Sequence, residues 1–177
     1  MNARVTKLGA LALALVTAQL AWAASPKDAW ITTKAKLALL TADDVSVTSV
    51  NVDTMNGNVT LHGKVKSEAE KGRAEAAVKK VDGVKSVKNL LQVVPDAFKE
   101  VTKVADARIK EQLEAALKAD ASLKGIKIAS VNNGVVLLSG KTDSFEQKLR
   151  AVEAARGVAG VQRVATEIQV DAKGELQ

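Results

Sequence analysis

Two stretches of the chain repeat one pattern of apolar and polar positions. They are residues 57–64 (GNVTLHGK) and residues 134–141 (GVVLLSGK), which lie 77 positions apart. In each, an Asn-Gly pair opens an apolar run of strand length that a second glycine ends. Asn-Gly favours the positive φ angles of a two-residue turn, so each stretch predicts a β-hairpin. The residues with this structural role are Asn56, Gly57 and Gly63 in the first copy and Asn133, Gly134 and Gly140 in the second.

An amphipathic helix is predicted before each hairpin. Apolar residues recur at i, i+4, i+7 and i+8 from Ile31, and the same spacing begins again at Ile109. The offset between copies is 78 at these helices and 77 at the hairpins. We expect this change in the loop around Asp43 and Asp120, or as a bulge in the outer hairpin strand. The outer strands are expected to contain Val45, Val47, Val50 and Val52 in the first copy and Ile126, Ile128 and Val131 in the second.

A second helix and a last strand are predicted after each hairpin. Ser67 with Glu70, and Ser144 with Gln147, have the spacing of a capping box that starts a helix. Both helices carry stripes of small apolar residues, which allow a sheet to approach closely. We expect them to stop at Gly83 and Gly160, and the last strands to alternate through Val87, Asn89, Leu91 and Val93, and through Val164, Thr166, Ile168 and Val170.

Each copy therefore has the order α-β-β-α-β, which predicts an α+β protein of two repeated modules. In each module, two helices should cover one face of a three-stranded mixed sheet whose last strand follows a right-handed crossover. Module one is predicted over residues 24–95 and module two over residues 96–172, with a short semi-rigid joint at residues 95–103. Residues 173–177 form a C-terminal tail.

The start of the chain has the pattern of a secretory signal peptide. Arg4 and Lys7 precede an uncharged apolar run over residues 8–20, and residues 21–23 (AWA) match an A-x-A cleavage site. The run is shorter than the roughly 20 residues that a membrane span needs. We therefore expect cleavage of residues 1–23, export of the chain and no integral membrane span in the mature chain.

The charge and composition exclude some partners. Removal of the leader lowers the formal net charge from +6 to +4, and cysteine is absent, so an exported chain would fold without disulfides. Basic and acidic residues are interspersed, and the whole chain has no Tyr and two Phe. Nucleic-acid binding needs a basic stripe and aromatic side chains that stack on bases, so it is not expected. A mild attraction to anionic lipid headgroups is compatible with this charge.

The motifs of both copies resemble those of the BON domain. The resemblance rests on Gly-x-Val-x-Leu-x-Gly before a helix, and on Gly-Val-x-x-Val-x-Asn-x-Leu-x-Val at residues 83–93. Residues 28–34 (DAWITTK) are similar to the hyperosmotically inducible periplasmic proteins of the OsmY type. Copy two departs from the pattern at Thr166, where the motif has Asn. The resemblance implies a non-catalytic periplasmic module that associates with phospholipid or envelope surfaces under stress.

No catalytic, metal-binding or cofactor-binding site can be assembled from the sequence. His62 is the only histidine, its counterpart in copy two is Ser139, and no other residues are spaced to make it a metal ligand or a general base. We expect His62 to be a surface residue of its strand. Asp43 and Asp44 are expected to be solvated, and Trp30 to pack at the start of its helix. An enzyme is therefore not expected, and no cofactor is implied.

One apolar stripe has no counterpart in copy one. Phe145, Leu149 and Val152 recur at i, i+4 and i+7 of the second helix of module two, about 140° around the helix from the stripe that should face the sheet. Lys148 and Arg156 flank the stripe. We expect this candidate interaction face to be covered by module one, by a membrane or by a client protein.

Two functions remain open from the sequence. The first is weak association with anionic phospholipid or envelope surfaces during osmotic or envelope stress. The alternative is a periplasmic protein-interaction or chaperone-like factor that holds client proteins. The protein is expected to be a monomer.

Overall fold

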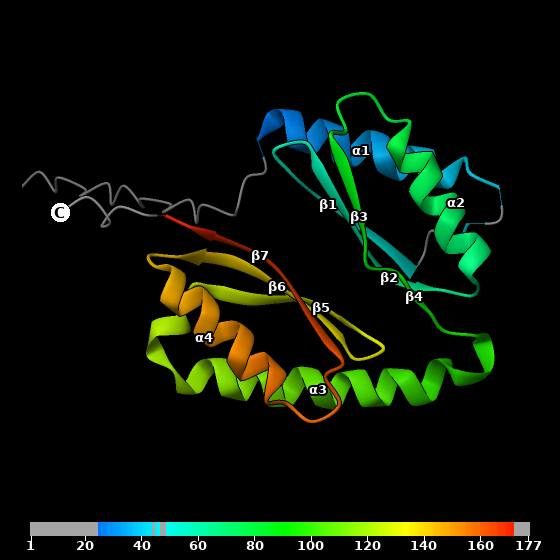
Figure 1. The fold of residues 1–177 in the computed structure, drawn as a ribbon. Coiled ribbons are helices and arrows are strands. Elements are labelled where there is room, and N and C mark those ends of the chain that lie inside the picture. The colour runs from blue at the N-terminus through cyan, green and yellow to red at the C-terminus, as the bar shows by residue number, and fades with distance from the viewer. Residues whose placement is uncertain (1–24, 44, 47–48, 172–177) are drawn as a thin grey trace, which may run out of the picture.

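The computed structural model of the protein describes residues 25–43, 45–46 and 49–171. The predicted leader at residues 1–23 and the tail at residues 173–177 lie outside the described residues. The described part is an α+β protein of two modules with mixed sheets, which confirms the predicted fold class. Figure 1 shows the two sheets between two pairs of helices, one pair belonging to each module.

Module one begins with α1 (Pro26–Leu40), followed by the antiparallel hairpin of β1 (Val50–Met55) and β2 (Asn58–Val65). Next, α2 (Glu68–Lys79) leads to β3 (Ser86–Asn89) and β4 (Gln92–Val93), both parallel to β2. The last strand was expected to be continuous, but it is interrupted at Leu90 and Leu91. The Asn89 side chain accepts a hydrogen bond from the Leu91 amide there (3.1 Å).

Module two begins with the short 3-10 helix η2 (Asp96–Phe98) and α3 (Lys99–Ala119). The 3-10 helix η3 (Ala121–Leu123) precedes the hairpin of β5 (Ile126–Asn132) and β6 (Val135–Thr142). Finally, α4 (Phe145–Arg156) leads to β7 (Arg163–Val170), which is parallel to β6 along its whole length. The joint between the modules is therefore largely helical.

The two hairpins differ by a bulge. Val52 pairs with Leu61, and its counterpart Ile128 pairs with Leu138. Further along the strands, Thr54 and Val131 are also counterparts. Copy two therefore has one more residue in this strand, at Ala129, where the pairing register shifts. The loop before the strand is correspondingly shorter in copy two. The change in offset thus lies in the loop and in the strand together.

Two details of the expected elements are wrong. Val45 precedes β1 and packs against the core from a loop, and Val47 lies outside the described residues. The second helices end at Lys79 and Arg156, before the glycines that were expected to stop them.

The two predicted capping boxes are confirmed. Ser67 and Ser144 accept from the amides of Glu70 and Gln147. In return, Glu70 accepts from the Lys66 amide (2.7 Å) and Gln147 from the Asp143 amide (3.0 Å).

A buried carboxylate ties the first helix of each module to its hairpin turn. Asp28 accepts hydrogen bonds from the amides of Asn56 (3.0 Å) and Gly57 (2.8 Å). Asp106 does the same for the amides of Asn133 (2.9 Å) and Gly134 (3.0 Å). The two aspartates are only 5% and 6% exposed, so their charge is stabilised by these donors rather than by water. Each aspartate thereby holds the first helix against the sheet, and the apolar core of the module is packed between helix and sheet.

The two sheets meet through the faces that their own helices leave uncovered. Leu90 of module one packs with Leu137 and Ala165 of module two in a small apolar cluster. Beside it, the Lys64 ammonium lies 2.8 Å from the Asp106 carboxylate, and both side chains are largely buried. The protein is therefore layered as helices, sheet, sheet and helices (Figure 1).

The Asp28 carboxylate gives a prediction about stability. Replacement by Ala leaves two turn amides without their acceptor, so Asp28→Ala should lower the free energy of unfolding by about 2–4 kcal/mol in urea titrations. Asp143→Ala, in an exposed loop, is the control and should change it by less than about 0.5 kcal/mol. Equal effects of the two substitutions would contradict this role of Asp28.

The same contact predicts a pH dependence. Burial raises the pKa of Asp28, but hydrogen bonds from Gly57, Asn56 and Ser25 outweigh it and hold the pKa below the usual 3.8. Because the folded state has the lower pKa, this stabilisation is complete above pH 3.8 and is lost as the pH falls through the folded-state value. The stability difference between wild type and Asp28→Ala should therefore shrink below pH 3.8. A difference that stays constant into this range would argue against an ionised acceptor.

Gly140 gives a matched pair with Gly72. Gly140 has a φ of +135°, and a Cβ there would collide with the carbonyl oxygen of Gly125. Gly140→Ala should therefore destabilise the protein by about 1–3 kcal/mol. Gly72 lies in α2 with open space around it, so Gly72→Ala should stabilise it by about 0.5–1 kcal/mol. Thermal unfolding of both variants checks the opposite signs.

Candidate functional site

The turn and strand-end residues shape the backbone and offer no reactive groups. Asn56 and Asn133 have φ angles of +54° and +46°, and the glycines that follow them also have positive φ. Gly63 has a φ of +128°, and a Cβ on it would collide with the carbonyl oxygen of Ser49. These positions therefore place the strands that carry other side chains.

The predicted interaction face on α4 is open to solvent. Phe145 is 63% exposed and Leu149 is 48% exposed, while Val152 is partly buried. Module one does not cover this face, so of the three alternatives a membrane and a client protein remain. Lys148 does not flank an open surface either, because its ammonium donates to the Ile168 carbonyl (3.0 Å). Arg156 is exposed at the end of the helix.

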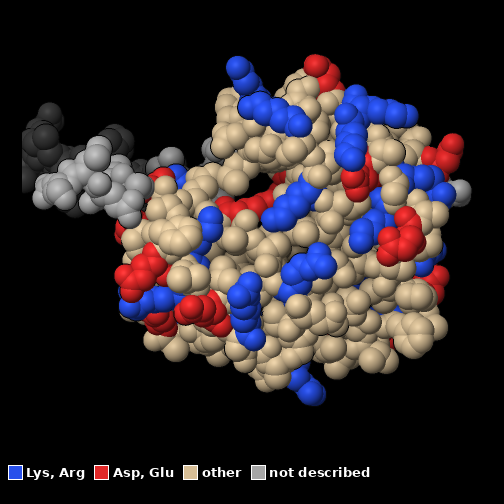
Figure 2. Space-filling model, in the orientation of Figure 1, with Lys and Arg blue, Asp and Glu red and all other residues tan. Residues whose placement is uncertain are grey.

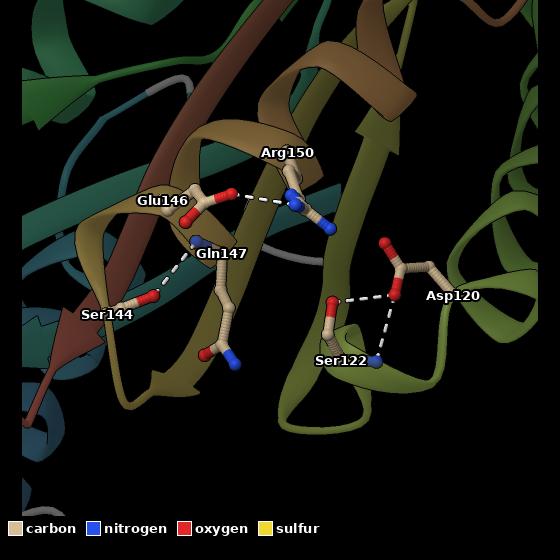
Figure 3. Close-up of polar contacts among 6 residues, drawn as sticks. All are labelled: Asp120, Ser122, Ser144, Glu146, Gln147 and Arg150. Carbon is tan, nitrogen blue, oxygen red and sulfur yellow. Dashed lines mark hydrogen bonds and ion pairs between the residues drawn. The ribbon is translucent and has the colours of Figure 1, made fainter.

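The polar groups near this face are engaged in local contacts. Figure 3 shows Ser144 accepting from the Gln147 amide (3.3 Å) and Arg150 donating to Glu146 (2.7 Å). Asp120 accepts from both the amide and the hydroxyl of Ser122 (2.9 and 2.6 Å). Ser144 and Asp120 are thus capping residues, and the charges around the exposed apolar pair largely neutralise one another.

The outer face of α1 is a second apolar surface, and the sequence analysis missed it. Trp30 is 61% exposed, so the expectation that it packs is wrong. Leu37 and Leu40 are 60% and 65% exposed. They lie on the side of the helix opposite the buried stripe that starts at Ile31. We call Trp30, Leu37 and Leu40 the α1 face. Their spacing of i, i+7 and i+10 places them on one side of a helix, and this spacing could have revealed the α1 face from the sequence.

The exposed charged residues of α1 are all basic. The helix contains Lys27, Lys34 and Lys36, and its only acidic residue is the buried Asp28. The Lys34 ammonium lies 5.6 Å from the centre of the Trp30 ring. It also lies 3.4 Å from the carboxylate of the exposed Asp82. The α1 face is therefore an apolar surface bordered by cations.

The positions of α3 equivalent to the α1 face lack these features, although Phe98, Val101 and Val104, at and near the start of α3, are 60%, 71% and 63% exposed. Arg108, Ala115 and Lys118 occupy the places of Trp30, Leu37 and Leu40. The BON-like fold of a module does not require apolar residues there, and the α3 surface can serve as an internal control for the α1 face.

The sequence predicted that His62 lies at the surface, but this prediction is wrong, because module two covers this side of the sheet. Its side chain is 7% exposed, and Nε2 lies 3.0 Å from an Asp53 carboxylate oxygen. Its Nδ1 atom is buried and has no hydrogen-bond partner among the described residues. His62 alternates with residues of the module's core, so the sequence alone could not reveal that its face is covered as well.

A cavity of about 1210 Å³ lies between the modules beside His62. Figure 2 shows a hollow between the two halves of the molecule, with acidic and basic side chains at its rim. Its walls come from α1, β1 and the sheet of module two. The charged residues among them are Asp28, Lys36, Asp53, Lys141 and Glu167.

No group of three or more His, Cys, Asp or Glu in the described part of the chain is arranged to hold a metal ion. Within the same residues, no helix is long and apolar enough to cross a membrane. The exposed apolar surfaces are thus the α4 face, the α1 face and the group of Phe98, Val101 and Val104, and the candidate cavity between the modules is lined by polar and apolar groups.

Comparison with protein families gives two matches to the BON domain, over residues 27–95 and 105–172. These matches coincide with the two modules. Osmotically-inducible protein Y of Escherichia coli (strain K12) is 36% identical over 146 residues, which cover 80% of this chain and 72% of that protein.

Two solved structures of CdsD, a structural protein of the Type III secretion system of Chlamydia trachomatis, are also similar. The first is 16% identical with a TM-score of 0.30, and the alignment covers 78% of this chain and 59% of that one. The second, a C-terminal domain, is 12% identical with a TM-score of 0.33, and the alignment covers 78% and 96%. Scores this low support no inference about this protein.

Proposed function

The chain belongs to the BON-domain family, and from that premise we propose that it is a non-catalytic envelope protein of the periplasm that associates weakly with anionic phospholipid surfaces. The name of its relative from Escherichia coli, an osmotically inducible protein, supports a role in osmotic stress. The apolar leader pattern of residues 1–23 supports export.

The observation that carries this proposal is the α1 face. An interfacial helix places aromatic and aliphatic side chains at the boundary of the acyl chains and lysines near the headgroups. Trp30, Leu37 and Leu40 supply the first set, and the lysines of α1 supply the second without an exposed acidic residue on the helix. The helix stays folded on its module through Asp28, so binding needs no rearrangement.

The expected affinity is low. A lysine near an anionic membrane contributes about 1 kcal/mol before salt screening. The helix α1 has only three lysines, of which Lys34 pairs with Asp82 and Lys36 lines the cavity. The α1 face is short, and its apolar residues enter only the interfacial region. Association should therefore be reversible and sensitive to ionic strength.

Vesicle binding tests the proposal. Trp30 is the only tryptophan after residue 23, so a blue shift of its fluorescence reports insertion directly. We expect a shift with vesicles that contain phosphatidylglycerol, and none with phosphatidylcholine alone or at high salt. Leu37→Glu should abolish the shift, whereas Ala115→Glu, at the equivalent place on α3, should leave it unchanged. Equal effects of the two substitutions would rule out the α1 face as the lipid-binding surface.

The α4 face favours a second candidate function, the holding of client proteins. Phe145 and Leu149 are exposed but are surrounded by balanced charges, which suits an unfolded polypeptide better than an anionic membrane. Both side chains lie outside the core, so their replacement should change stability by less than about 0.5 kcal/mol.

A crossed experiment separates the two functions. Phe145→Glu with Leu149→Glu should weaken the suppression of aggregation of an unfolded client and leave vesicle binding intact. Leu37→Glu should do the reverse. If the double variant suppresses aggregation as well as wild type does, the α4 face has no role in holding clients.

A further inference from the structure

The strand β1 lies at the edge of its sheet. Of the strands that the structure describes, only β2 pairs with it. The six residues of β1 pair in unbroken register from Val50 to Met55. A regular edge strand presents a row of unpaired backbone groups that can bind another extended chain.

The register identifies these backbone groups. Met55 and Asn58 flank a two-residue turn and form a hydrogen-bonded pair, and bonded and non-bonded pairs alternate from there along the strands. Val52 is opposite Leu61, whose carbonyl instead accepts from the Leu90 amide on the other side of β2 (2.8 Å). Val52 and Thr54 therefore direct their N–H and C=O groups outward.

The cavity of about 1210 Å³ follows this edge. Six consecutive residues, Asn51 to Asn56, line it, and consecutive residues of a strand share a cavity only when it wraps around the strand's edge. On one side the cavity is closed by Thr32 and Lys36 of α1, and on the other by the sheet of module two. It is larger than a typical small-molecule pocket of ~300–1,000 Å³.

The equivalent edge in module two is blocked. The bulge at Ala129 interrupts β5, and bulges are one means by which proteins protect sheet edges. The cavity beside β5 has only about 320 Å³, and the ion pair between Lys64 and Asp106 lies in its wall. The remaining edges are less suitable, since β3 and β4 are short and β7 contributes only alternate residues to the large cavity.

The ion pair that Lys64 makes beside β5 has no equivalent beside β1. Lys141 and Asp28 are the counterparts of Lys64 and Asp106, and both line the cavity. However, the Ser25 hydroxyl donates to Asp28 (2.9 Å) and takes the place that a lysine occupies on Asp106. Lys141 pairs instead with an exposed aspartate, Asp171, at 3.5 Å. The modules are therefore not drawn together on this side.

We propose that the free edge of β1 binds an extended polypeptide segment, which adds a strand to the sheet inside the cavity. Val52 and Thr54 supply the main-chain hydrogen bonds. The walls contain small, polar and both positively and negatively charged side chains, so recognition is of the backbone and tolerates many sequences. This site is distinct from the α1 and α4 faces and does not depend on lipid association.

Amide hydrogen exchange measured by NMR tests the site directly. The probe is reduced, carboxymethylated α-lactalbumin, a soluble unfolded chain, and native α-lactalbumin is the control. We expect the unfolded chain to slow exchange at Val52 and Thr54, and to leave Asp53 and Met55 unchanged because these already bond to β2. No slowing at Val52 and Thr54, or equal slowing at all four amides, would overturn the proposal.

A pair of variants at Thr54 provides an independent test. Thr54→Pro removes the outward N–H of an edge strand and should weaken binding of the unfolded chain about tenfold, the effect of one lost hydrogen bond. Thr54→Val keeps the N–H and loses only the hydroxyl that contacts Thr32 (2.8 Å), so it should bind like wild type. Both variants should keep the far-ultraviolet circular dichroism spectrum and the cooperative thermal unfolding of wild type, which shows that they are folded. Equal binding of the unfolded chain by a folded Thr54→Pro variant would refute the edge site.

Discussion

The bond between a buried carboxylate and a hairpin turn is the constraint on which this structure depends. Asp28 and Asp106 each accept two turn amides, and the Asn-Gly pairs that offer those amides need the positive φ angles that such a turn imposes. The first helix is thereby held across one face of the sheet, where its apolar stripe completes the core. The third donor differs between the copies. A lysine from module one reaches Asp106, so that carboxylate also contacts the other module, whereas the hydroxyl of the nearby Ser25 donates to Asp28.

Both faces of each sheet are consequently covered. One face of the sheet meets the helices and the other meets the opposite module, so the surfaces left for partners are the outer sides of the helices and the sheet edges. The α1 face is apolar with a basic border, and the α4 face is apolar with balanced charges. The β1 edge offers backbone groups in a cavity lined by both polar and apolar groups. The repeats have kept one fold and have diverged at these exposed positions. That divergence is physically inexpensive, because exposed substitutions change stability little.

Much of the fold could be predicted from the sequence because local signals agree with it. The Asn-Gly turns, the capping serines and the apolar spacings all act within a few residues. The unequal offset between the copies indicated a change in the loop or in the outer strand, but it did not place the bulge at Ala129. Burial by the second module could not be predicted, since the alternation that places His62 opposite the core is the same whether that face meets water or protein. The exposure of Trp30 and Leu37 could have been deduced from their place opposite Ile31. A shared structural role of Asp28 and Asp106 could also have been deduced, because they stand at equivalent positions of the first helices of the two modules.

The most direct test of this account is the exchange rate of the Gly57 and Gly134 amides in the unliganded protein at neutral pH. Glycine amides at hairpin tips ordinarily exchange fast, because they are exposed and locally mobile turns open easily. If the buried aspartates hold the turns, both amides should exchange only through global unfolding, as slowly as the amides of the central strands β2 and β6. Exchange at the rate of an open loop at either glycine would show that the carboxylate does not constrain the hairpin.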